Sequence, residues 1–399
     1  MPGSSRRPGL GPRVPARAVV ARTAPVIGLA DATHLAAPFP HAGKAPSLST
    51  VPTRPRRART RALVGAAAAV AAVSLAACSS DPGSTGAEAA TGGATAVDPG
   101  PRTTYPLALD NCGTKVTFQA APDRVVTIKS STTEMMLALG LGDHVVGSAF
   151  LDGPLPDALK TAAAGNEAIT KPMAAQVPGS EAVLALQPDL VYAGWESNVT
   201  AQGAGARPTL AKLGVNTYVS PSACQEKAYQ PDPLTFDDVF AEISEVGKVF
   251  DVQGRAAALV AEQKEQLAAV PQDGSGHTAL WWSSGNGTPY VGAGIGAPAM
   301  IMKTVGLKNV AADVPMTWTP LSWEKIIAAD PDVIVLVDAS WNTAQAKIDY
   351  LESNGATKNL QAVKHHRYVV LPFASTEAGV RNVDAATTIA ADLKKLDWS

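Results

Sequence analysis

The feature that most constrains this chain is an internal repeat, in which a short helix-like segment opened by glutamate runs into Pro-Asp and then into an apolar strand. The first copy begins at Glu181 and reaches its Pro-Asp pair at Pro188, and the second begins at Glu324 and reaches Pro331. The copies align without a gap, because 324 − 181 and 331 − 188 both equal 143. A repeat of one supersecondary unit predicts two similar lobes.

After Tyr105, short β-branched runs alternate with longer helix-like stretches, which is typical of α/β proteins with parallel sheets. A second correspondence supports two lobes, because 125–141 and 279–307 both read strand, serine-rich loop, helix and Gly-Leu. The expected strands are 125–128, 145–148, 190–193, 217–219, 278–282, 333–337 and 368–371. The expected helices are 131–139, 181–186, 207–213, 235–250, 253–270, 297–305 and 323–328.

The segment between the two copies of the repeat, 253–270, has a continuous helical pattern. Its apolar positions, such as Leu259 and Val260, alternate with charged ones, such as Glu262 and Lys264, as in an amphipathic helix. One long helix of this kind would form a stiff connection. The predicted fold class is therefore α/β, with two pseudo-symmetric lobes that contain mostly parallel central strands and are joined by one long backbone helix.

An apolar stretch, 62–77, ends in Leu-Ala-Ala followed by Cys78. It is shorter than the roughly 20 apolar residues that span a membrane, and five arginines precede it, so it suits a signal peptide. Cys78 resembles the lipidated cysteine of a bacterial lipobox, which would become the first residue of the mature protein. The alternative is an ordinary secretory signal cleaved after Ala77.

The region before this signal, 1–50, is rich in arginine, proline and alanine without hydrophobic periodicity. We interpret it as disordered or as lying upstream of the real translation start, which we expect at Val51. The predicted organisation is then a signal peptide at 51–77, a flexible tether at 78–104, an N-terminal lobe at 105–250, an interlobe helix at 251–272 and a C-terminal lobe at 273–399.

Several classes of function lack support in the sequence. The 33 basic and 35 acidic residues are balanced, so nucleic acid is not an expected partner. No G-x-S-x-G, H-E-x-x-H or P-loop motif is present, and the cysteines lack C-x-x-C spacing. A metal-binding protein of this architecture would need histidines at strand ends, whereas His144 and His277 precede strands. We expect no catalytic site, no metal and no cofactor.

The segments 124–134, 137–147 and 306–310, together with the two Glu…Pro-Asp units, resemble the class III solute-binding proteins of ABC importers. Members of that family bind siderophores, cobalamin and related large ligands in a shallow cleft between two lobes that one long helix joins. The resemblance covers roughly 122–396. It implies a monomeric protein, anchored to the membrane by lipid on its extracytoplasmic face, that serves permease and ATPase subunits.

In that family, one surface glutamate on each lobe docks onto arginines of the permease. The matching residues are Glu181 and Glu324, which open the helices of the repeat. Two like charges at equivalent positions of similar lobes also suit a partner with twofold symmetry. The alternative is that each is a first-turn acid favoured by the helix dipole, an effect of about 0.3–1 kcal/mol.

Three further segments, 229–240, 290–298 and 376–384, resemble a subgroup named as binding proteins for the phosphorylated deazaflavin precursor of a redox coenzyme. The resemblance implies that precursor as the ligand. The alternative is a ferric siderophore or a corrinoid, because the fold and the docking logic would be the same.

Ligands of open α/β lobes lie beyond the carboxyl ends of the strands, which points to the loops that follow them. There, aromatic rings could sandwich a planar ligand, although packing inside a lobe is the alternative. Arg381 lies in a polar loop where it could bind phosphate or carboxylate, unless it pairs on the surface with Glu377 or Asp384. The predicted ligand-binding residues are Lys129, Ser130, Ser131, Thr132, Trp195, Glu196, Tyr229, Trp282, Ser283, Tyr290, Trp318, Trp341 and Arg381.

Two cysteines remain once Cys78 is assigned to lipidation. Cys112 and Cys224 lie in loop contexts of an exported protein, which permits a disulfide between them. Such a bond would clip the N-terminal segment to the first lobe. The alternative is two free thiols.

Overall fold

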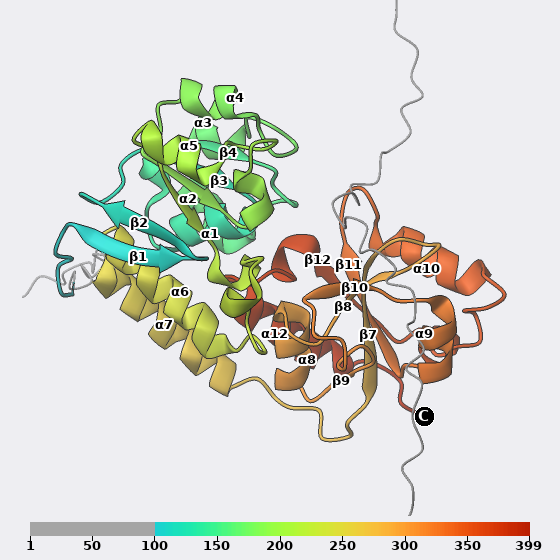
Figure 1. Cartoon of the computed structure of the whole chain (residues 1–399). Coiled ribbons are helices and arrows are strands. Elements are labelled where there is room, and N and C mark those ends of the chain that lie inside the picture. The colour runs from blue at the N-terminus through green and yellow to red at the C-terminus, as the bar shows by residue number, and fades with distance from the viewer. Residues whose placement is uncertain (1–99) are drawn as a thin grey trace, which may run out of the picture. The chain divides into compact units, whose positions relative to one another are not determined.

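The computed structural model describes residues 100–399, which form two α/β lobes (Figure 1). The first lobe contains a four-stranded parallel sheet in the order β4-β3-β5-β6. Every residue of β3 and β5 is buried, as expected for central strands of a parallel sheet covered on both faces. The bounds are β3 (Val125–Ile128), β4 (Val145–Ala149), β5 (Leu190–Ala193) and β6 (Asn216–Val219).

The second lobe contains a six-stranded mixed sheet. Its order is β10-β8-β7-β11-β12, and β9 also pairs with β7. β7 is parallel to β9 and β11, and β11 is parallel to β12, whereas β8 and β10 are antiparallel additions. The bounds are β7 (Thr278–Ser284), β8 (Tyr290–Gly292), β9 (Lys308–Asn309), β10 (Trp318–Pro320), β11 (Val333–Asp338) and β12 (Tyr368–Pro372).

The two sheets share one topology. The parallel strands β9-β7-β11-β12 of the second lobe follow the same order along the chain and in space as β4-β3-β5-β6 of the first. The two-lobed α/β fold predicted from the repeat is therefore confirmed. The seven strands expected from the sequence all exist, with ends that differ by at most two residues.

The Pro-Asp units of the repeat have the same structural role in both lobes. The carboxylate of Asp189 accepts hydrogen bonds from the backbone N–H groups of Asp123 and Arg124, at 2.8 and 3.0 Å, just before β3. The carboxylate of Asp332 accepts one from the N–H of Thr278 at 2.8 Å, at the start of β7. Asp189 thus ties the start of β5 to the start of β3, and Asp332 ties the start of β11 to the start of β7. This shared role explains why the Pro-Asp pair recurs.

Helices cover both sheets. Those of the first lobe are α1 (Ser130–Ala138), α2 (Asp157–Ala163), α3 (Glu167–Thr170), α4 (Ser180–Ala185) and α5 (Arg207–Lys212). Those of the second are α8 (Ala297–Thr304), α9 (Trp323–Ala329), α10 (Ala344–Ser353), α11 (Gln361–Lys364) and α12 (Asn382–Leu393). Short 3-10 turns lie at η1 (Gly142–His144), η2 (Glu196–Val199), η3 (Pro221–Ala223), η4 (Lys227–Tyr229) and η5 (Phe373–Ser375).

Two helices, rather than one, connect the lobes. α6 (Phe236–Val249) and α7 (Gln253–Ala268) lie side by side in Figure 1. A Cβ atom at Gly247 would lie 2.5 Å from that of Ala256, so glycine permits their close packing. The amide of Gln263 on α7 donates to the carbonyl of Val380 in the second lobe at 2.8 Å. The predicted long helix is thus α7, and α6 braces it against the first lobe.

The structure has an antiparallel hairpin that we did not predict from the sequence, β1 (Leu107–Asn111) and β2 (Thr114–Phe118). Buried Arg207 holds its end by donating to the carbonyl of Asn111 at 2.9 Å. Cys112 follows β1 and forms a disulfide with Cys224, with Cα atoms 5.3 Å apart. The bond joins the hairpin to the loop after β6, as the sequence suggested it would.

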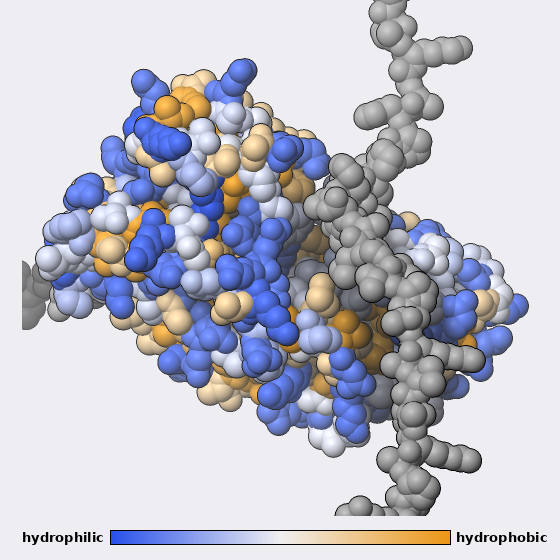
Figure 2. All heavy atoms as spheres, in the orientation of Figure 1, coloured by the Kyte–Doolittle hydropathy of each residue, from blue (hydrophilic) through white to orange (hydrophobic). Residues whose placement is uncertain are grey.

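The predicted signal peptide, Cys78 and the tether up to residue 99 lie outside the described residues. Within 100–399, no helix has both the length and the apolar character needed to span a bilayer. On the face shown in Figure 2, hydrophilic residues dominate the surface and hydrophobic ones form small, scattered groups.

Removal of the disulfide should destabilise the protein, because the bond closes a long loop and restricts the unfolded chain. We expect the Cys112→Ala/Cys224→Ala variant of the soluble protein to lose about 2–5 kcal/mol of unfolding free energy. Urea unfolding followed by circular dichroism measures the loss. An unchanged midpoint in the double variant would contradict the assigned role.

Candidate functional site

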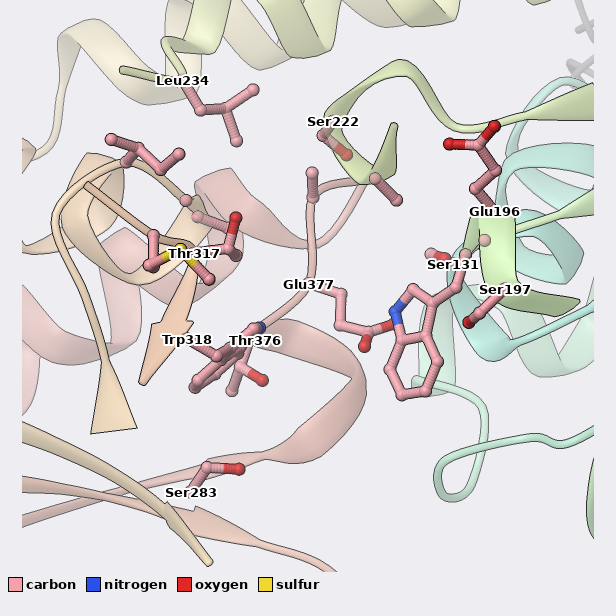
Figure 3. Close-up of a pocket in the computed structure, with 18 of the residues that line it drawn as sticks. Ser131, Glu196, Ser197, Ser222, Leu234, Ser283, Thr317, Trp318, Thr376 and Glu377 are labelled. Carbon is pink, nitrogen blue, oxygen red and sulfur yellow. The ribbon is translucent and has the colours of Figure 1, made fainter. Parts of the chain in front are cut away.

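A cavity of about 590 Å³ lies between the two lobes (Figure 3). Its first wall follows β5 and β6 of the first lobe, and its second wall follows β7, β11 and β12 and includes β8 and β10. The cavity therefore lies at the carboxyl ends of the parallel strands, where α/β folds place their ligands. Its lining includes the aromatic residues Trp195, Tyr290, Trp318 and Trp341 and the acidic residues Glu196 and Glu377.

Aromatic side chains from both lobes surround this space. Tyr290 and Trp318 lie on adjacent strands with their rings nearly parallel, at 15° and with centroids 6.3 Å apart. Trp341 is 52% exposed at the rim and makes an edge contact with Phe373, with centroids 5.2 Å apart. Trp195 faces them from the first lobe. Such rings present flat apolar surfaces to a ligand at a low cost in side-chain entropy.

A buried lysine fixes the loop that carries Trp341 by hydrogen bonds to its backbone. Lys347 on α10 donates to the carbonyls of Val337 and Asn342, at 2.7 and 2.6 Å. Burial lowers the pKa of Lys347 to about 8. Asp338 adds a second anchor, because its carboxylate accepts from the N–H of Ala344 at 2.8 Å. These bonds hold the loop in which the Trp341 ring stays half exposed at the rim of the cavity.

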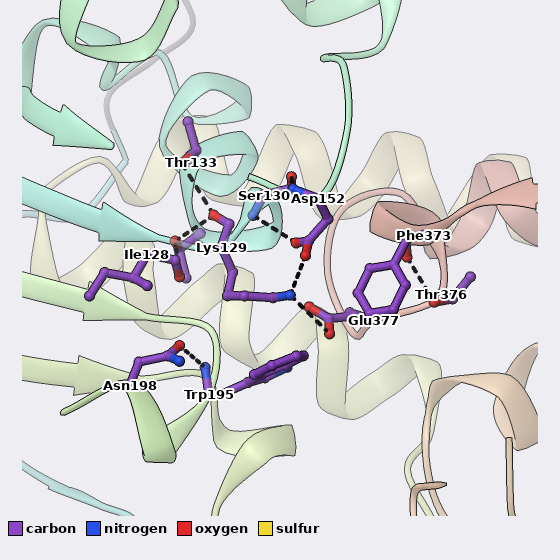
Figure 4. Close-up of polar contacts among 11 residues, drawn as sticks. Ile128, Lys129, Ser130, Thr133, Asp152, Trp195, Asn198, Phe373, Thr376 and Glu377 are labelled. Atoms are coloured by element: carbon purple, nitrogen blue, oxygen red, sulfur yellow. Dashed lines mark hydrogen bonds and ion pairs between the residues drawn. The ribbon is translucent and has the colours of Figure 1, made fainter. Parts of the chain in front are cut away.

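Beneath Trp195 lies a buried group of charges (Figure 4). Lys129 is fully buried, and its ammonium forms an ion pair with Asp152 and lies 3.6 Å from the carboxylate of Glu377. The same ammonium lies 3.7 Å from the centre of the Trp195 ring and 4.8 Å from that of Phe373. Cation–π contacts of this kind strengthen when water is excluded. Residues of both lobes thus share one buried cation.

Lys129 adopts an unusual backbone conformation where β3 ends and α1 begins. Lys129 has φ 91° and ψ 154°, a region that usually only glycine adopts and that costs about 1–3 kcal/mol. Its N–H donates to the carbonyl of Ala149 at 3.0 Å. A Cβ atom at Gly194 would lie 2.8 Å from that of Lys129, so glycine lets β5 end against this turn.

A second buried ion pair joins the lobes directly. Arg381, at the start of α12, donates through Nε to Glu134 Oε2 on α1 at 2.6 Å, and through Nη2 to Glu134 Oε1. Nη2 also donates to the carbonyl of Pro154 at 3.0 Å. Burial raises the pKa of Glu134 to about 6 against the opposing effect of Arg381. This paired geometry fixes both distance and orientation between α1 and α12.

Glu377 is the ionisable residue that connects the charge group to the cavity. It lines the cavity, although only 8% of the residue is exposed. Its Oε1 accepts no hydrogen bond from the described residues. Burial raises its pKa to about 8, Asp152 adds to the rise and Lys129 opposes it. Asn382 fixes the loop by donating to the Glu377 carbonyl at 2.7 Å.

Some of the predicted ligand-binding residues lie at the cavity and some do not. Seven line it: Ser131, Trp195, Glu196, Ser283, Tyr290, Trp318 and Trp341. Lys129 and Arg381 do not, because each is buried in an ion pair. Arg381 pairs with Glu134 rather than with Glu377 or Asp384, which we had considered as surface partners.

The other four corrections have local causes. The hydroxyl of Ser130 accepts from the N–H of Asp152 at 2.8 Å, and that of Thr132 donates to the carbonyl of Ile128 at 3.1 Å, so both hydroxyls bond to the neighbouring backbone. Trp282 is fully buried and packs edge-on against Trp323, with centroids 5.2 Å apart. Tyr229 donates to Asp110 at 3.2 Å and lines a neighbouring cavity instead.

That neighbouring cavity, of about 380 Å³, shares four lining residues with the first: Ser222, Gln230, Leu234 and Ala378. Its acidic lining residues are Asp232, Asp238 and Glu242. Burial raises the pKa of Glu242 to about 7, and the hydroxyl of Tyr192 donates to it at 2.9 Å. Between the two cavities, the N–H of Leu234 donates to the carbonyl of Ile295 at 2.9 Å, which joins the lobes again.

Sequence reasoning missed Glu134 and Asp152, which complete the buried charge group. The polar run at residues 130–134 is the sequence feature that contains Glu134, and its burial, which is unusual for Ser, Thr and Glu together, is visible only in the structure. Asp152 lies in a loop without any distinguishing pattern. Among the described residues, no group of three or more His, Cys, Asp or Glu is arranged to hold a metal ion.

Comparison with known proteins agrees with this architecture. The family model for periplasmic binding proteins matches residues 125–374, and the chain therefore belongs to the periplasmic binding protein family.

Among individual relatives, an uncharacterised ABC transporter substrate-binding lipoprotein of Bacillus subtilis, YvrC, is 26% identical over 72% of this chain and 85% of its own length. A cobalamin-binding protein of Halobacterium salinarum is 30% identical over 57% of each chain. Among solved structures, an ABC-type Fe3+-hydroxamate transport protein of Saccharomonospora viridis is 28% identical with a TM-score of 0.62, over 73% of this chain and 99% of its own.

Loss of one partner of the interlobe ion pair should destabilise the protein strongly. We expect Arg381→Met to cost about 3–5 kcal/mol, because it leaves Glu134 buried without its cation. The Arg381→Met/Glu134→Leu variant should regain much of that loss, since both charges are gone. Urea unfolding of the wild type, Arg381→Met, Glu134→Leu and the double variant measures the four free energies that the comparison needs.

Lys171→Met provides the matched control, because it breaks the exposed pair with Glu167 and should change stability little. Strictly additive effects of the two interlobe substitutions would contradict a direct pairing of Arg381 with Glu134.

Proposed function

We propose that this protein is the extracytoplasmic substrate-binding lipoprotein of an ABC importer and that it holds a large organic ligand in the interlobe cavity. The observation that carries the proposal is the 590 Å³ space at the strand ends, lined with aromatic rings from both lobes. A volume of this size suits a ligand of several rings, because pockets of about 300–1,000 Å³ hold drug-sized molecules. The protein delivers that ligand to permease and ATPase subunits, with Cys78 as its lipid anchor.

For the ligand, we place a ferric siderophore or a corrinoid before the phosphorylated deazaflavin precursor. Relatives named for cobalamin and for ferric hydroxamate transport support the first two. A phosphate group would need cations, and none of the cavity-lining residues in 100–399 is a lysine or an arginine. Arg381, which we expected to bind phosphate, is already paired with Glu134.

The proposed docking residues occupy equivalent, accessible positions. Glu181 is the second residue of α4, and Glu324 is the second residue of α9, and both side chains are exposed. The repeat continues into the backbone, because Gln187 and Asp330, also 143 residues apart, both have positive φ, at 49° and 40°. This equivalence supports a matched pair of contacts with a permease of twofold symmetry.

Ligand binding can be followed through the tryptophans of the soluble protein from Asp81 onward. We expect saturable quenching of its fluorescence by a ferric trihydroxamate or a cobalamin. Trp341→Ala should weaken that affinity by about tenfold, because an exposed stacking surface is lost.

Trp398→Phe is the control, since Trp398 stacks on His277 and does not line the cavity. Quenching by the deazaflavin precursor alone would reverse our order of ligands. An unchanged affinity in Trp341→Ala would argue against this cavity as the binding site.

Docking is tested separately from binding. We expect Glu181→Arg/Glu324→Arg to abolish uptake of labelled ligand by cells, while the purified variant binds that ligand with unchanged affinity. Glu167→Arg, which reverses an exposed acid on α3, should leave uptake intact. Normal uptake by the double variant would rule out the docking role.

A further inference from the structure

The charge of the cavity lining is one-sided. The main cavity includes the carboxylates of Glu196 and Glu377, and the neighbouring cavity adds Asp232, Asp238 and Glu242. Neither lining contains a lysine, an arginine or a histidine within the described residues. A cleft lined by charges of one sign attracts ligands of the opposite sign.

Two buried cations close to the cavity already have carboxylate partners. Lys129 is paired with Asp152, and Arg381 with Glu134, and both cations are buried. Neither is available to a ligand without breaking an ion pair that also joins or supports the lobes. A ligand with a net negative charge would therefore meet Glu196 and Glu377, and the Lys129 ammonium beside Glu377 is already shared with Asp152.

One of these carboxylates, Glu377, is only loosely paired. Its Oε1 is buried and accepts no hydrogen bond, and it lies 3.6 Å from the Lys129 ammonium, which Asp152 already holds in a closer ion pair. The Glu377 side chain lies near Trp195, because the Lys129 ammonium is 3.6 Å from Glu377 Oε1 and 3.7 Å from the centre of the Trp195 ring (Figure 4). A carboxylate next to an aromatic face is the arrangement that binds ammonium groups, because charge and ring quadrupole act together.

We infer that this cavity selects a cationic organic ligand and that Glu377 is the residue that recognises its positive charge. The inference rests on the proposed function, because it names the charge class of the ligand that the same cavity takes. Glu196 supports the selection from the other wall, where its position is held by the N–H of Gln225 at 2.6 Å.

Binding of a cation should then depend on pH. The groups that face Glu377 are Lys129 and Asp152 of the first lobe, with Arg381 and Glu134 next to them. Without ligand, the pKa of Glu377 is raised to about 8, so its carboxyl group is mostly protonated below pH 8. A cation that binds to the ionised carboxylate must then displace this proton. Affinity should therefore rise from pH 6 to pH 8, by up to about tenfold per pH unit, and then level off.

A matched pair of ligands tests the inference on the unaltered protein. One is the ferric complex of a linear trihydroxamate that ends in a primary amine, and the other is its N-acetylated form, which lacks only that positive charge. We expect the amine form to bind at least about tenfold more tightly at pH 8, and a ferric catecholate complex of net negative charge to bind weakest. Fluorescence titration measures all three.

Variants then identify the residue. Glu377→Gln should bring the ratio of the affinities for the amine and acetylated forms close to one, and it should flatten the pH dependence of binding of the amine form. Glu265→Gln changes an exposed residue of α7, and this variant should keep both the preference for the amine form and its pH dependence. Circular dichroism establishes that each variant is folded.

The outcomes separate the two claims. Equal binding of the amine and acetylated forms, or tighter binding of the anionic complex, would overturn the cationic selection and leave the importer role standing. Binding of none of these ligands or of cobalamin would show that the proposed ligand class is wrong, and the inference would fail with it.

Discussion

The rest of this structure depends on buried charges shared between the two lobes. Lys129 and Asp152 come from the first lobe, Glu377 comes from the second, and Arg381 reaches across to Glu134. A buried pair is costly to break, because the charge left behind has neither water nor a partner. The lobes are therefore held by directional contacts at the floor of the cavity, in addition to α6 and α7. Such contacts oppose large changes in the spacing of the walls.

The same contacts determine what the cavity offers a ligand. Because the ion pairs retain the positive charges, the lining is left with aromatic rings, hydroxyl and amide groups, and carboxylates. The strained backbone of Lys129 is part of this arrangement, and its ammonium lies 3.7 Å from the centre of the Trp195 ring. Strain at such a place is commonly offset by surrounding contacts and accompanies function.

Much of the fold followed from the sequence because it rests on local patterns. The repeat predicted two lobes of one topology, and β-branched runs predicted β3, β5 and β11 to within one residue. The hairpin β1-β2 and the added strands β8 and β10 escaped prediction, because short antiparallel strands carry little periodicity. The strand-end rule found Trp195 and Trp341. It placed Lys129 and Arg381 wrongly, since the partners that bury them, Asp152 and Glu134, are distant in sequence and no local pattern links them.

The central claim is that the interlobe cavity binds the transported ligand while the buried charges keep the lobes in place. A crystal structure of the soluble protein with a bound ferric trihydroxamate tests it most directly. We expect the ligand between Trp195 and the Trp318–Tyr290 pair, with the Arg381–Glu134 ion pair intact. A ligand bound elsewhere, or lobes that rotate and break that ion pair, would contradict the account.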